Sequence, residues 1–144
     1  WGFDLDLGEM SRISLAMAWF REQGRFTWDG TEYQLSREGP WTGDFLLIAD
    51  DQVLAHATKD SVFVRSFTVR LDGRELLFRA QARLFRRFEL IEGDSVVGEI
   101  VPVHFLTRTC TVDLPEDLAV PVRVFLFWLA AILWRRQSNA AAGS

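Results

Sequence analysis

An apolar segment near the C-terminus constrains the fold more than any other feature. Val124 to Trp134 is eleven residues long and contains no polar side chain. As a helix it would be about 16 Å long, whereas a bilayer core requires about 30 Å and about 20 residues. Extending it back to Leu118 gives seventeen residues but includes Pro121 and Arg123. A helix that is apolar on every side lies either in lipid or inside a protein core.

The preceding chain contains amphipathic strands that can surround such a helix. An internal repeat with an offset of 43 residues relates 25–35 to 69–78 and 44–57 to 87–100. Each unit contains an Asp-Gly pair between alternating apolar runs, which predicts a tight hairpin turn. In 75–84 apolar and polar residues alternate, as in a strand with one buried face. A fixed offset over this length predicts one four-stranded unit used twice.

Together, these features predict a mainly β fold: a closed antiparallel β-barrel of two four-stranded repeats plus extra strands, wrapped around the C-terminal helix. Closure would bury the apolar strand faces and leave no exposed sheet edge. We expect one domain over residues 1–136, a helix at about 118–135 and a disordered tail over 137–144. The expected core residues of the helix are Val124, Phe125, Phe127, Trp128, Leu129 and Ile132. The alternative is a membrane-anchored protein whose helix 118–136 inserts in the bilayer.

This order of elements resembles the tubby C-terminal-like superfamily, which includes tubby domains, phospholipid scramblases and LURP-one-related proteins. Segment 112–134, acidic and then apolar, is similar to the C-terminal segment of scramblases and LURP-one-related proteins. Segment 85–100 is similar to their strand pair with a glycine in the second strand. The resemblance covers roughly residues 20–136. It implies a β-barrel around a central helix and a role in binding anionic phospholipid. Calcium binding is not carried over, because the acids at 113, 116 and 117 lack calcium-loop spacing.

A run of arginines is the candidate ligand site. Four arginines lie within nine residues with no acid among them, namely Arg79, Arg83, Arg86 and Arg87. Guanidinium groups pair well with phosphate, so the run is a candidate for binding an anionic lipid headgroup. The alternative is a solvated strand face. Arg79 and Arg83 share a face by parity, whereas the face of Arg86 and Arg87 depends on where the next strand begins.

The sequence carries no catalytic or metal-binding motif. His56 and His104 have no ligand partners at suitable spacing, and Cys110 lies on the apolar side of its strand. We therefore expect no enzyme, no metal, no cofactor and no small-molecule substrate. A net charge of −4 argues against a nucleic-acid partner. The expected partner is an anionic phospholipid or a protein, met in the cytoplasm or at the membrane periphery. A structural scaffold without a small ligand is the remaining alternative.

Overall fold

The structure, a computed structural model, describes residues 2–6, 12–18, 22–39, 43–60, 65–81, 84–104 and 109–143. Within these ranges the chain forms an antiparallel sheet followed by one helix. The elements are β1 (Gly2–Asp6), β2 (Arg12–Ala18), β3 (Gln23–Trp28), β4 (Thr31–Glu38), β5 (Asp44–Ala49), β6 (Gln52–Lys59), β7 (Ser66–Leu71), β8 (Arg74–Gln81), β9 (Leu84–Glu92), β10 (Ser95–His104), β11 (Thr109–Asp113) and α1 (Val120–Ala142).

The strands form a meander in which each strand pairs with its neighbours in the chain, from β1 to β11. The β3–β4 and β7–β8 hairpins turn at Asp29-Gly30 and Asp72-Gly73, as the dipeptides predict. All four residues have positive φ, between 43° and 77°. A two-residue turn with positive φ at both positions matches the right-handed twist of the flanking strands, which explains why Asp-Gly is used twice.

The 43-residue repeat appears as two equivalent four-stranded units, β3–β6 and β7–β10. Equivalent positions have equivalent burial. Phe45 and Phe88 are both fully buried, and Val53 and Val96 are both 56% exposed. The two units therefore direct the same positions inward and outward.

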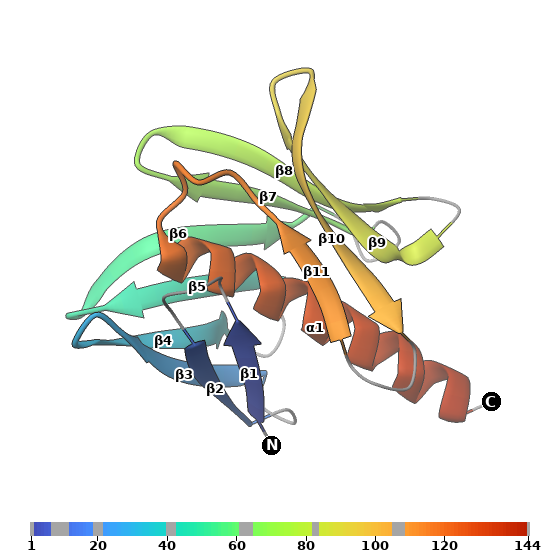
Figure 1. Ribbon diagram of the computed structural model, residues 1–144, viewed down its shortest axis with the longest axis horizontal. Helices are drawn as coiled ribbons and strands as arrows, with labels where there is room; N and C mark the ends of the chain where they lie inside the picture. Colours follow the sequence, from blue (N-terminus) through green and yellow to red (C-terminus); the bar gives the residue numbers. More distant parts are fainter. Residues whose placement is uncertain are drawn as a thin grey trace.

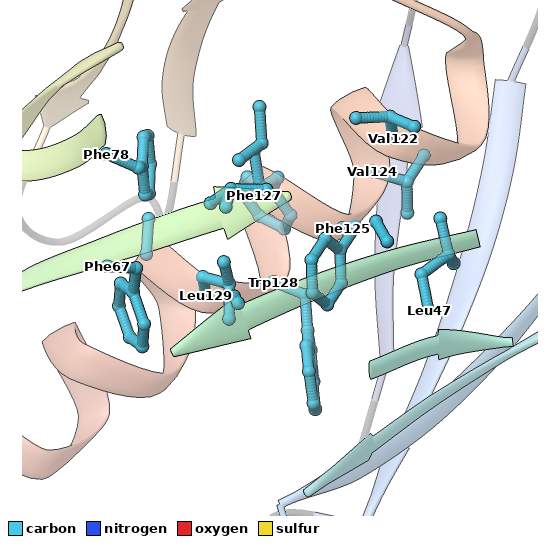
Figure 2. Close-up of a cluster of buried hydrophobic side chains, with 14 of the residues drawn as sticks. Leu47, Phe67, Phe78, Val122, Val124, Phe125, Phe127, Trp128 and Leu129 are labelled. Carbon is cyan, nitrogen blue, oxygen red and sulfur yellow. The ribbon is translucent and has the colours of Figure 1, made fainter. Parts of the chain in front are cut away.

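The sheet curves around α1 (Figure 1). The apolar residues of α1 and of the strands form one buried core. Every residue from Val124 to Leu133 is buried, including the six assigned to the core. Figure 2 shows α1 side chains such as Trp128 packed among strand residues such as Leu47 and Phe67. The burial extends around the whole helix circumference, which explains its lack of a polar face.

The β-rich class with a C-terminal helix is confirmed, whereas closure of the barrel is not. Among the described residues β1 pairs with β2, β11 pairs with β10, and no ladder joins β1 to β11. In the part of the chain that the structure describes, the sheet therefore wraps around α1 with no hydrogen bonds that close it.

The helix differs from its predicted bounds. It begins at Val120 and continues to Ala142, so the tail predicted to be disordered from 137 is helical as far as Ala142. Alanine has the highest helix propensity, and three alanines occupy positions 140–142. Gly143 follows and donates its N–H to the Asn139 carbonyl at 3.0 Å. In the described part of the chain, no helix combines the length and hydropathy that crossing a bilayer requires.

Candidate functional site

The predicted arginine run does not gather on one face of the sheet. Arg79 and Arg87 point outward, and each lies beside an acid: Arg79 Nε is 3.8 Å from Glu89, and Arg87 Nε donates to Glu99 at 3.0 Å. Arg86 has the opposite parity on β9, and its backbone carbonyl accepts a hydrogen bond from the Trp134 indole at 2.8 Å. Arg83 lies outside the described residues. The described arginines of the run are thus divided between two faces.

A different set of cations occupies inward-facing positions at one end of the sheet. Arg37 is the register partner of Phe45, and Lys59 is the register partner of Phe67. Both phenylalanines are fully buried, so both cations lie on the inner face. Arg65 lies two residues before Phe67 and shares its face. These three cations come from β4, the end of β6 and the residue just before β7.

The C-terminal half of α1 brings a fourth cation to the same end. The Arg136 guanidinium carbon is 5.8 Å from the centroid of the Phe45 ring. Arg136 also donates two hydrogen bonds to the Glu22 carboxylate, at 2.7 and 2.6 Å. The same carboxylate lies 3.3 Å from Arg37 Nη1. We call Arg37, Lys59, Arg65 and Arg136 the basic cluster.

The pKa of Lys59 reflects its burial and two neighbouring cations of the basic cluster. Burial lowers the pKa of Lys59 from its ordinary value, and the positive charges of Arg136 and Arg65 lower it further. A like-charge effect of this kind requires a positive local potential. The basic cluster is therefore a positive site on a chain whose overall charge is −4.

Sequence reasoning missed the basic cluster because its members are spread from position 37 to position 136. No local motif relates them. The signal that was available is strand parity. Each of these three cations lies two residues from the last inward-facing apolar residue of its strand and therefore faces inward too. The paired N–H groups of arginine and the ammonium group of lysine, gathered on one surface, can bind a multiply charged oxyanion such as phosphate.

A second group of chemical interest lies on the outer face of β4, β5 and β6. Glu38, Asp44 and His56 place one ligand atom each within 4.8 Å of one another. Glu38 and Asp44 are direct register partners, and His56 is diagonal to Asp44 across the next strand pair. We call these three residues the outward triad. Sequence spacing alone assigned no partners to His56, because only the pairing register brings the carboxylates beside it.

The structure also has an open cleft of about 430 Å³ beside β6 and the β7–β8 hairpin. Val53 and Leu54, which are 56% and 38% exposed, form part of its wall. His56 and the segment 70–75 form the rest together with Ala55. The members of the basic cluster do not line this cleft.

Comparison with known proteins found no matching family model, no matching curated protein and no matching solved structure. The likeness to the tubby C-terminal-like superfamily therefore stays a prediction.

Proposed function

We propose that this chain is a non-enzymatic binding module that holds the phosphate of an anionic lipid headgroup in the basic cluster. The observation that carries the proposal is the convergence of four cations from separate segments at one end of the sheet. Burial and the neighbouring Arg136 and Arg65 lower the pKa of Lys59, so its charged form is disfavoured, and a bound anion would favour it.

The Glu22 carboxylate indicates how an anion would be held. Its two oxygens accept hydrogen bonds from the Arg136 fork, while Arg37 approaches from the sheet. A phosphate monoester offers three acceptor oxygens and a charge of about −1.5 to −2. It can therefore replace the carboxylate on Arg136 and Arg37 and also reach Lys59. In this scheme Glu22 is an internal competitor for the site.

A lipid headgroup is favoured over a soluble anion by the resemblance to the tubby-like superfamily, whose tubby domains bind phosphoinositides through Lys and Arg. Cations beside an anionic membrane surface contribute about 1 kcal/mol each, and this attraction falls off within a Debye length. Binding through the basic cluster should consequently be strong at low salt and weak at high salt.

Vesicle flotation tests the proposal. The parent protein is mixed with neutral vesicles and with vesicles containing a phosphorylated inositol lipid, at low and high salt. A variant with Arg37→Gln, Lys59→Gln and Arg136→Gln should lose flotation with the anionic vesicles. A control with Arg79→Gln and Arg87→Gln, which changes the outward arginines, should float like the parent. Circular dichroism verifies that each variant is folded.

Each outcome has a definite meaning. If the folded cluster variant floats normally, the basic cluster is not the lipid-binding site. If the control fails to float, the outward arginines Arg79 and Arg87 bind the lipid. Flotation that resists salt and occurs with neutral vesicles would indicate insertion of the helix. A parent that never floats would favour a protein partner or a scaffold.

Two further arms refine the result. Glu22→Gln should strengthen binding to anionic vesicles, because it removes the charge of the internal competitor. Competition with soluble inositol phosphate, but not with inorganic phosphate at the same concentration, would show that the headgroup rather than phosphate alone is recognised.

We also propose that the sheet closes into the tubby-like barrel. The order of elements supports this: a continuous antiparallel meander is followed by a helix that the sheet surrounds. Nuclear Overhauser contacts between backbone protons of β1 and β11 would establish closure. Rapid amide exchange along the facing edges of both strands would argue for an open sheet.

A further inference from the structure

The outward triad comes from three adjacent strands and differs in chemistry from the basic cluster on the inner face. His56 Nε2 is shielded from solvent and has no hydrogen-bond partner among the described residues. It lies 3.5 Å from Asp44 Oδ2. Glu38, the register partner of Asp44, completes the group from the other side. One imidazole and two carboxylates thus offer ligand atoms within 4.8 Å of one another.

The internal repeat provides a comparison for this arrangement. The equivalent positions in the second unit, 43 residues later, are Gln81, Arg87 and Glu99. There Arg87 pairs with Glu99, and the Gln81 amide donates to a neighbouring carboxylate. The second unit therefore contains its own cation at this place. In the first unit Asp44 stands where Arg87 stands and His56 where Glu99 stands, and Glu38 adds a second carboxylate that could help hold a cation.

The nearest strand neighbours of the outward triad do not supply such a cation. Arg70 is the register partner of His56, but its Nε donates to the Glu75 carboxylate at 3.1 Å. Arg70 is therefore paired with an acid that does not belong to the outward triad. Thr58, the register partner of Asp44, is uncharged.

From this geometry we propose that Glu38, Asp44 and His56 bind a divalent transition-metal ion of the Zn²⁺ type. One imidazole nitrogen and two carboxylate oxygens form a normal ligand set for zinc, with bonds of about 2.0–2.2 Å and water in the fourth position. Tetrahedral ligands of this bond length lie about 3.3–3.5 Å apart, so atoms already within 4.8 Å need only small rotamer changes. Ca²⁺ and Mg²⁺ are disfavoured, since they prefer oxygen ligands throughout.

Isothermal titration of metal-stripped protein with zinc chloride tests the proposal. We expect one Zn²⁺ per chain for the parent, and at least a tenfold loss of affinity for His56→Gln and for Asp44→Asn. Glu32→Gln is the matched control, because Glu32 is an exposed acid on the same face of β4 as Glu38. This control should bind Zn²⁺ like the parent.

Cobalt provides a second readout that reports the ligands directly. The parent with Co²⁺ should show visible absorption of a tetrahedral site, and His56→Gln should lose it. The proposal is overturned if the parent binds no Zn²⁺, or if both triad variants bind it with unchanged affinity. It is also overturned if binding survives His56→Gln and disappears in His104→Gln, or if Ca²⁺ binds equally well. These outcomes do not depend on lipid binding, because Glu38 and Arg37 face opposite sides of the sheet.

Discussion

Two tryptophans of α1 allow a sharp test of the packing argument. Trp128 is completely buried and packs edge-on against Phe45 at 5.5 Å, yet its indole N–H has no hydrogen-bond partner among the described residues. Trp134 is less buried, and its N–H donates to the Arg86 carbonyl at 2.8 Å. Replacement of each by phenylalanine removes the N–H and some volume but keeps an aromatic ring. The two substitutions should have different costs.

The expected magnitudes follow from these contacts. A buried N–H without a partner costs about 1–3 kcal/mol, and Trp128→Phe removes this cost. The smaller ring leaves a void of about 40 Å³, which costs about 1 kcal/mol at about 24 cal/mol per Å³, in addition to the lost transfer free energy. These terms nearly cancel, so the free energy of unfolding should change by less than about 1 kcal/mol. Trp134→Phe loses a hydrogen bond at an exposed position, where water can then reach the carbonyl, and it also loses ring volume, so it should cost about 1 kcal/mol or slightly more.

Urea unfolding followed by far-ultraviolet circular dichroism measures both variants without using tryptophan fluorescence. An unchanged slope with urea concentration would show that the midpoint shift reports stability. Trp128→Ala serves as the reference for a true cavity and should cost about 3–5 kcal/mol. If Trp128→Phe is more destabilising than Trp134→Phe, buried apolar area alone governs the ranking and the argument about the N–H is wrong.

Three other perturbations have definite expected results. Phe127→Asp should prevent soluble folding because it places a charge in a dry core, whereas Leu54→Asp at an exposed position should leave the protein soluble, as measured by expression and gel filtration. Burial raises the pKa of the Cys110 thiol to about 11 from the ordinary 9.0. The folded thiol should therefore react slowly with Ellman's reagent at pH 8 and rapidly in urea. Since folding favours the protonated thiol, its contribution to the free energy of unfolding should be complete below about pH 9 and lost as the pH rises through about 11. Gly98→Ala would place a Cβ 2.7 Å from the Asp113 carbonyl oxygen, so thermal unfolding should show a loss of about 1–3 kcal/mol.

The parts of the fold that depend on local chemistry could be predicted from the sequence. Asp-Gly pairs require a particular turn, alternation requires a half-buried strand, and an apolar helix without a polar face requires an enclosing shell. No local sequence signal predicts closure of the sheet, because closure depends on pairing between the first and last strands. The end of the helix was missed because alanines at 140–142 continue it without any tertiary contact being needed.

The candidate sites depend on pairing register, which sequence spacing does not contain. Even-numbered positions face inward on both β8 and β9, since Phe78 and Phe88 are both fully buried. Arg86 therefore differs in face from Arg79 and Arg87, because successive residues of a strand alternate between its two faces. The basic cluster and the outward triad both depend on strand pairing. The triad needs β4, β5 and β6 in register, and the basic cluster needs β4, β6 and β7 in register with α1 placed beside them.

The position of α1 after the described strands in the chain has a consequence for biosynthesis. Every strand leaves the ribosome before the helix that fills the space between them. During that interval the apolar inner faces of β3 to β10 have no permanent partner, although each hairpin can already form from neighbouring residues. The nascent chain should therefore remain a loosely ordered sheet that is vulnerable to aggregation and chaperone capture, and it should acquire its cooperative structure in a single late step when α1 emerges.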